Sequence, residues 1–541
     1  MTKTVLLALT LGSFLTTSGP AWAASDAERV KGFMDRLYAH QKQQLGQQMG
    51  KVQETGTMTI KDQGKYFNVS YPALTFEQNG VIMALGPIQM NVMPGDKPTE
   101  WKATIAVPSP IKFTNTKTKE VVNFVMGTQS MSAIIDDATL FPRMMNVQYK
   151  DVSISEAGDA KEKLAVTIGD IGVKAEYAEV GPGLLSGPFN FAVNNIKVEE
   201  VKAGEKAPST LQVGSFVIEG QVDKLDMAMI ETFDTKMKEL NEGGFDPDKV
   251  TTPQSMDALW KIVMEYGVGQ MDGIQANISA KDIRFTEVES EGKPMSVSID
   301  EAGYGIDTSG WRGDKSRGDF SFVLKMKDWS VDGLTAPELK RYMPEDMNIR
   351  FGYKDLPHRA LMQQLGALAS AGVGMDAKGS DAKANMQMIG MQAMMSVPAL
   401  LANAGTVFTI NDTKIKSGDY DVRADGTFTA SSNAIYGGAG SAKVVFTGLD
   451  QIATDLQAMA SKSGAAPDVT TQATKILQGL SAIQMFGQQG TGADGKPARI
   501  YDFFLDDKGA VKLNGTDMSA LMGGGGAAVP EPEPVVPTTT P

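Results

Sequence analysis

The chain has 541 residues, with 51 Lys and Arg against 64 Asp and Glu, no Cys, two His and 32 Met. A chain of this length exceeds what one hydrophobic core usually serves, so we expect several cores or one elongated layered body. The lack of Cys excludes disulfides, zinc–thiolate sites, iron–sulfur clusters and thiol nucleophiles. His40 and His358 alone exclude a multi-histidine metal site. The net charge of −13 disfavours nucleic acid and anionic lipid headgroups as partners.

Residues 1–23 are typical of a secretory signal. Lys3 precedes an apolar stretch from Val5 to Leu15, and Pro20-Ala-Trp-Ala23 ends in the Ala-x-Ala pattern of a cleavage site. The alternative, a buried N-terminal helix, fits the short apolar run and its flanks less well. We therefore expect cleavage near Ala23, export and a periplasmic location. No later segment is apolar over the length that a transmembrane helix needs.

The mature chain is predicted to begin with a helix within residues 24–55. Over Asp26–Met49, apolar residues such as Val30, Phe33 and Leu37 recur near one helical face. From residue 56 the pattern changes to short β-like segments separated by turn signals such as Asn79-Gly80.

Many of these segments alternate between apolar and polar residues. In Phe320-Ser-Phe-Val-Leu-Lys-Met326, large apolar residues occupy every second position, which is the period of a sheet with one buried face. Predicted strands include Val121–Met126, Leu164–Ile168 and Gly172–Tyr177, with glycines between or after them.

Three helix pairs interrupt the strands, at 225–268, 356–403 and 450–487. Each pair follows a strand that ends near an Asp able to cap a helix, and each is followed by another strand. The sequence therefore predicts an α+β fold of extended curved antiparallel sheets with repeated strand–helix–helix–strand modules. The predicted domains are a β-rich domain over 56–351 and an α+β domain over 352–516. Residues 517–541, rich in Gly and Pro, are predicted to form a disordered tail.

The last module resembles a known type of envelope protein. The segments Gly440-Ser-Ala-Lys-Val-Val-Phe-Thr-Gly-Leu-Asp450 and Tyr501-Asp-Phe-Phe-Leu-Asp-Asp-Lys-Gly-Ala-Val-Lys-Leu-Asn-Gly515 resemble the closing part of an uncharacterised exported Gram-negative family, of the domain-of-unknown-function class. That family is similar in architecture to the AsmA-like proteins. The resemblance implies long antiparallel sheets with helical ends, and an apolar sheet surface that can hold lipid chains. It implies no catalytic residues.

A methionine cluster is the candidate ligand-binding surface. It places five thioethers within ten residues, at Met386, Met388, Met391, Met394 and Met395. Helical spacing brings such side chains together, and thioethers bind Cu(I). They also form adaptable apolar surfaces. We favour a core or lipid-facing helix over a copper site, and no cofactor or metal is predicted.

Several short motifs approach catalytic or adhesive signatures without completing them. Gly490-Thr-Gly-Ala-Asp-Gly-Lys-Pro497 lacks the final Ser or Thr of a P-loop and precedes a strand. Ser380-Asp-Ala-Lys383 has the spacing of acylating serine enzymes but lacks their other motifs. Arg312-Gly-Asp314 and Arg317-Gly-Asp319 are Arg-Gly-Asp tripeptides that also suit a polar turn.

These observations predict a non-enzymatic envelope protein that holds a lipid-like ligand in an apolar groove of the sheet. One alternative is a scaffold that binds another envelope protein and no ligand. Another is a hydrolase that uses carboxylates alone, which would need a cleft holding two Asp or Glu side chains.

Overall fold

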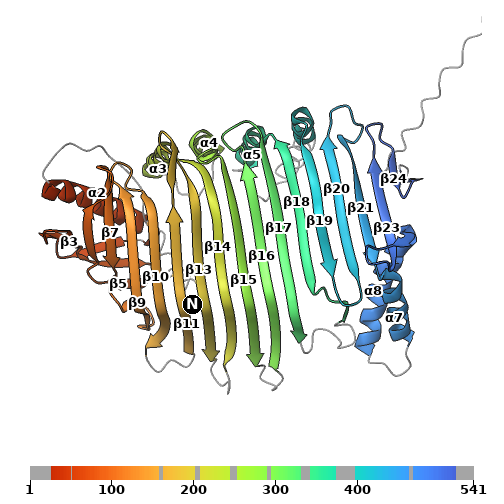
Figure 1. Cartoon of the computed structure of the whole chain (residues 1–541), viewed down its shortest axis with the longest axis horizontal. Coiled ribbons are helices and arrows are strands. Elements are labelled where there is room, and N and C mark those ends of the chain that lie inside the picture. The colour runs from red at the N-terminus through yellow and green to blue at the C-terminus, as the bar shows by residue number, and fades with distance from the viewer. Residues whose placement is uncertain are drawn as a thin grey trace, which may run out of the picture.

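The computed structural model describes residues 26–49, 51–157, 163–201, 208–243, 253–288, 294–330, 341–372, 396–461 and 467–518. Within these residues the chain forms one large open antiparallel sheet accompanied by a few helices (Figure 1). The predicted β-rich α+β class is confirmed. The prediction of several sheets is corrected, because all described strands belong to a single sheet.

The N-terminal part of the sheet divides at β9 (Val121–Asp136). One half of β9 pairs with β8 and the other half pairs with β7 along the same edge, whereas β10 pairs along the opposite edge. Two branches therefore leave this strand, one through β8, β5, β4 and β1, the other through β7, β6, β3 and β2. The short strands are β1 (Lys51–Thr55), β2 (Thr59–Asp62), β3 (Phe67–Ser70), β4 (Ala73–Gln78), β5 (Val81–Leu85), β6 (Gln89–Pro94), β7 (Glu100–Ala106) and β8 (Ile111–Asn115).

Helix α2 (Asp26–Met49) has the predicted bounds and packs on the second branch. Its Phe33, Met34 and Leu37 are completely buried in one cluster with Trp101 of β7. The rings of Phe33 and Trp101 stack with their centroids 5.4 Å apart. Each such side chain contributes about 1.5–3 kcal/mol when it is fully buried, so this helix is fixed mainly by its apolar face.

From β9 onward, the long strands pair in chain order. The short β12 pairs with β13 beside β11, and β22 and β24 share one edge of β23. These strands are β10 (Pro142–Ala157), β11 (Lys163–Glu176), β12 (Ala178–Gly181), β13 (Leu184–Val201), β14 (Ser209–Asp226), β15 (Gly273–Val288), β16 (Pro294–Ser309), β17 (Ser316–Ser330), β18 (Asp346–Leu356), β19 (Val407–Lys416), β20 (Asp421–Ala430), β21 (Gly438–Thr447), β22 (Gln488–Thr491), β23 (Pro497–Leu505), β24 (Val511–Leu513) and β25 (Thr516–Asp517).

The helices are inserted between strands that are neighbours in the sheet. The first group separates β14 from β15, the second separates β18 from β19, and the third separates β21 from β23. Figure 1 shows α3, α4 and α5 beyond one end of the long strands, and α7 and α8 at the opposite end near the C-terminal edge. The groups are α3 (Met227–Glu242), α4 (Pro253–Ile262) and the π-helical η3 (Val263–Gly267); α5 (His358–Gly372) and helical residues 396–404; and α7 (Leu449–Ser461) and α8 (Pro467–Phe486).

The cap predicted for the first helix pair is present at α3, because the Asp226 carboxylate accepts a hydrogen bond from the backbone N–H of Met229 at 3.0 Å. The predicted domain boundary between residues 351 and 352 falls inside β18. The strands themselves therefore show no break at that position.

A line of unusual backbone crosses the long strands. Asp151, Asn195 and Asp282, in β10, β13 and β15, have φ of 52°, 55° and 53°, a left-handed conformation that Asn and Asp tolerate better than most residues. Glycines lie beside them on the neighbouring strands: Gly127, Gly169 and Gly214. We call these six residues the kink line.

The kink line inserts one residue into each strand at the same level. As a result, Tyr149 and Val152 of β10 are both buried on one face although they are three residues apart. The same shift occurs in the neighbouring strands, so the register continues across the line and the apolar face is preserved on both sides.

Two predicted strand boundaries are corrected at this line. The strand predicted to end at Met126 continues through Gly127 to Asp136, and the strands predicted over Leu164–Ile168 and Gly172–Tyr177 are the single strand β11. The glycines at these points do not form turns. They leave room for the kinked residues beside them, since a Cβ atom at Gly169 would lie 3.0 Å from the Cβ of Asn195.

Candidate functional site: the open apolar face

Side chains on one face of the sheet form apolar rows that run across the strands. Because neighbouring residues in register point to the same face, each row can be followed from strand to strand. One row, from β10 to β18, contains Val147, Val173, Phe191, Ile218, Ile278, Tyr304, Phe322 and Ile349. The adjacent row, from β13 to β19, contains Phe189, Gly220, Ala276, Ile306, Phe320, Phe351 and Ile410.

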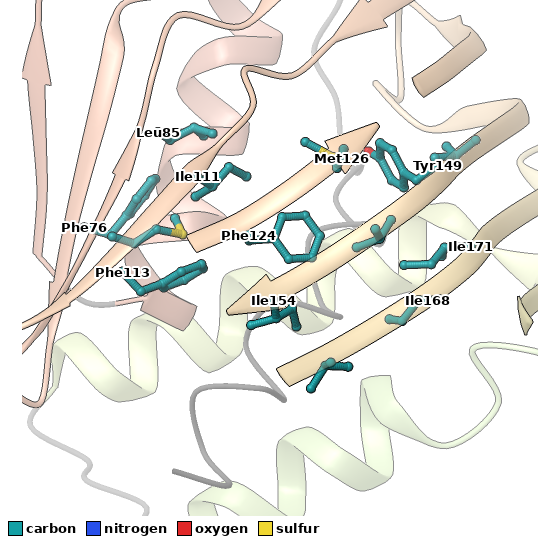
Figure 2. Packing of buried hydrophobic residues seen from close by; sticks show 14 of the residues in the cluster. Phe76, Leu85, Ile111, Phe113, Phe124, Met126, Tyr149, Ile154, Ile168 and Ile171 are labelled. Carbon is teal, nitrogen blue, oxygen red and sulfur yellow. The ribbon is translucent and has the colours of Figure 1, made fainter. Parts of the chain in front are cut away.

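The N-terminal end of these rows is buried. Val147 is only 2% exposed, and it belongs to a cluster that also contains Phe76 and Phe113 from the short strands and Phe124 and Tyr149 from the long ones. Figure 2 shows these aromatic side chains gathered with Ile154, Ile168 and Ile171. The first branch of the sheet thus covers the start of the apolar face.

The C-terminal end of the face is covered by α7 and α8. Ile452 and Leu456 of α7 form a small buried cluster with Ala473 of α8, and Phe446 of β21 packs against it. Arg499 of β23 donates a hydrogen bond to the Asp450 carboxylate at 3.0 Å and another to the carbonyl of Gly487 at 3.0 Å. This contact holds the two helices to the edge of the sheet.

Between these covers the apolar face is open. Tyr304 is 40% exposed, Phe322 39%, Phe351 49% and Ile410 42%. Burial along a single row therefore falls from complete at β10 to partial at β16. We define the open apolar face by its most exposed residues and their row neighbours: Ile218, Ile278, Tyr304, Phe320, Phe322, Phe351, Phe408 and Ile410.

The aromatic rings of this face support one another. Phe320 stacks on Phe351 with centroids 5.1 Å apart and an interplanar angle of 17°, and it contacts Tyr353 and Tyr304 at 6.0 and 6.4 Å. No charged residue occupies a row position in the described strands β14 to β20. The face therefore presents a continuous uncharged apolar surface with ordered rings.

The methionines predicted as the ligand-binding surface (Met386, Met388, Met391, Met394 and Met395) lie outside the described residues. Their role stays a prediction. The sequence signal that indicates the open face is the alternation in Phe320–Met326, which places large apolar residues on one face of the strand. This alternation does not show whether another element covers that face.

The two histidines are partly or fully buried within the fold. His358, at the start of α5, is 2% exposed, and its Nε2 lies 3.1 Å from the carbonyl oxygen of Trp311. Burial lowers the pKa of His358, and burial also lowers the pKa of His40 within α2.

The Arg-Gly-Asp tripeptides occupy the turn between β16 and β17 and the start of β17. Arg312 donates a hydrogen bond at 2.9 Å to the Asp226 carboxylate, and Arg317 donates one at 2.7 Å to the hydroxyl of Ser309. Both arginines thus make contacts within the fold. Residues 490–497 form the end of β22 and the turn into β23, in agreement with a Gly-rich loop before a strand.

Among the described residues, no group of three or more His, Asp or Glu side chains is arranged to hold a metal ion. In the same part of the chain, no helix has the length and apolar character needed to cross a membrane. Comparison of the sequence and structure with family models, curated proteins and solved structures found no match.

Proposed function

We propose that the protein is a non-enzymatic envelope protein that holds a lipid-like ligand against the open apolar face. The observation that carries this proposal is the exposure of uncharged rows whose continuation in β10 is fully buried. Large contiguous apolar surfaces are rare on monomeric soluble proteins and mark interaction sites.

The size of the face suits an acyl chain. Strands are about 4.8 Å apart in a sheet, so the five steps from β14 to β19 extend about 24 Å. A bilayer core about 30 Å thick implies chains of about 15 Å. A row can therefore accommodate a whole extended chain, with each buried CH₂ group contributing about 0.8 kcal/mol.

The chemistry of the face favours a lipid over a protein partner. Protein interfaces carry about one hydrogen bond per 100–200 Å². Here the backbone N–H and C=O groups are paired within the ladder, and among the residues that define the open apolar face only Tyr304 has a polar side-chain group. A hydrocarbon chain needs no hydrogen-bond partner, whereas a protein surface placed here would leave its own polar groups unpaired. The scaffold alternative therefore ranks second.

The proposal also includes export to the periplasm, with cleavage near Ala23, and membership of the exported envelope family that the third module resembles. The signal-like residues 1–23 and the β-rich fold support it. The finer pattern of repeated strand–helix–helix–strand modules is supported by the three helix groups between neighbouring strands.

The test uses the full chain purified from the envelope of its own host. We expect native mass spectrometry to show a bound lipid, and the delipidated protein to bind cis-parinaric acid saturably. Phe322→Asn should weaken binding of this probe about tenfold or more, because a Phe side chain contributes about 1.5–3 kcal/mol when buried. Ser321→Asn is the matched control, since Ser321 is the adjacent residue on the opposite face.

A ligand-free mass together with the absence of saturable probe binding would contradict the proposal. A dimer that Phe322→Asn dissociates, with no lipid bound, would support the scaffold alternative.

A carboxylate hydrolase is favoured by one observation. Asp307 of β16 and Asp319 of β17 are direct cross-strand partners, and both line a hollow of about 280 Å³ on the opposite face of the sheet. Two such carboxyl groups are the minimum for acid–base hydrolysis. If this activity exists, Asp307→Asn and Asp319→Asn should each abolish the hydrolysis of nitrophenyl glycosides. Hydrolysis that survives both changes would exclude this pair.

A further inference from the structure

Three hollows lined by described residues lie on the face of the sheet opposite the open apolar face. The hollows measure about 750, 710 and 280 Å³. The first and second share Met144 and Glu176, and the second and third share Gln275 and Asn277. They therefore adjoin one another and form a single trough that crosses the strands from β7 to β19.

Amide side chains line the middle of this trough. Asn190 of β13 and Asn277 of β15 lie in one cross-strand row, with Glu219 between them. Gln221 and Gln275 are paired in the adjacent row. Among the described residues, these four amides make no side-chain hydrogen bond to the protein. Their donors and acceptors are therefore available to a ligand.

Side chains of both charges line the trough, and some of them form ion pairs with each other. Four cationic and six acidic side chains line it, so a polyanion would meet more carboxylates than cations. Arg143 is paired with Glu179 at 3.2 Å and Lys97 with Glu100 at 3.3 Å. The other six charged side chains lie among six amides, and amide and carboxylate groups both bind the uncharged hydroxyls of a neutral ligand.

The geometry also disfavours an extended peptide. Peptides that join a sheet pair with an exposed strand edge, but the trough lies over strands whose backbone groups are already paired on both sides. Hydroxyl groups, by contrast, both donate and accept, and they match amide and carboxylate side chains directly. Gln221 and Gln275 lie on neighbouring strands about 4.8 Å apart, and Asn190 and Asn277 lie two strands apart at about 9.6 Å, so the amides can contact successive parts of one extended ligand.

We propose that this trough binds a neutral, hydroxyl-rich oligosaccharide, laid across the strands over Asn190, Asn277, Gln221 and Gln275. This site is independent of the lipid-like ligand, because it occupies the opposite face of the sheet.

The test is calorimetric titration of the full chain with cellohexaose and chitohexaose, and with a hyaluronate hexasaccharide as the charged comparison. We expect saturable binding of at least one neutral chain. The double variant Gln275→Ala/Asn277→Ala should weaken it about tenfold, the loss expected for two hydrogen bonds. Gln148→Ala is the matched control, because this exposed amide lies on the same face of β10 outside the hollows.

The proposal is overturned if neither neutral chain binds saturably, if only hyaluronate binds, or if the double variant binds like the unaltered chain. Equal weakening by Gln148→Ala would also overturn it. Circular dichroism confirms that each variant is folded. Phe322→Asn separates the two sites, since it should impair binding of cis-parinaric acid and leave oligosaccharide binding unchanged.

Discussion

At the residue scale, the kink line places a strict requirement on its glycines. A Cβ atom at Gly214 would lie 2.8 Å from the Cβ of Asp282, closer than side-chain carbons approach in folded proteins. Gly214→Ala should therefore lower the free energy of unfolding by about 1–3 kcal/mol, as overpacking does.

The matched control is Gly172→Ala. This glycine is also inside a long strand, but no atom lies within 4 Å of its added Cβ. The change should leave stability unchanged or raise it by up to about 1 kcal/mol, because Ala reduces the entropy of the unfolded chain. Urea unfolding of the two variants decides the point, and equal effects would show that the kink line tolerates bulk.

The two histidines make stability depend on pH. Burial lowers the pKa of both His358 and His40 below the ordinary value of 6.5. The unfolded chain therefore binds more protons than the folded chain as the pH falls below 6.5, and the free energy of unfolding decreases over this window. The variant with His40→Gln and His358→Gln should lose less stability between pH 7 and pH 5.5. Parallel pH profiles of the variant and the unaltered chain would contradict this.

At the element scale, Arg499 fixes α7 and the end of α8 to β23. Removing its guanidinium leaves the Asp450 carboxylate and the Gly487 carbonyl without this donor. Arg499→Met should lower the free energy of unfolding by about 1–3 kcal/mol and speed hydrogen exchange in α7. Lys496→Met is the control, because Lys496 is 73% exposed and its ion pair with Asp494 contributes little. Equal effects of the two changes would refute the role given to Arg499.

Many of the helices and strands could be predicted from the sequence, because each produces a local periodicity of apolar residues. The apolar positions of α2 and the alternation in Phe320–Met326 each reflect one buried face. The continuity of β9 and β11 could not be predicted, since Gly127 and Gly169 look like turn residues until the neighbouring strands are placed beside them. Row membership, such as Phe322 beside Tyr304, depends on register between strands and is not visible in either strand alone.

At the scale of the whole molecule, burial is uneven along the sheet. The strands β9 to β11 contribute to the large cluster under the first branch, whereas β16 to β18 expose Tyr304, Phe322 and Phe351. Local stability follows buried apolar contact. In the delipidated chain, backbone amides of β16 to β18 should exchange faster than those of β9 to β11. Addition of cis-parinaric acid should slow exchange in β16 to β18 alone, as mass spectrometry of peptide fragments can show. Uniform exchange would contradict this gradient.

The kink line also has a consequence for how such a sheet can change over time. Because each of these strands carries its extra residue at the same level, deleting that residue from one strand would move the side chains of half of that strand to the face opposite that of its neighbours. We therefore expect single-residue insertions and deletions to be tolerated only at the strand ends. Lengthening the molecule is far easier by adding a whole strand pair that already contains the kink than by altering any existing strand. Growth by such duplication would leave the alternation of glycine with Asp or Asn as its visible trace.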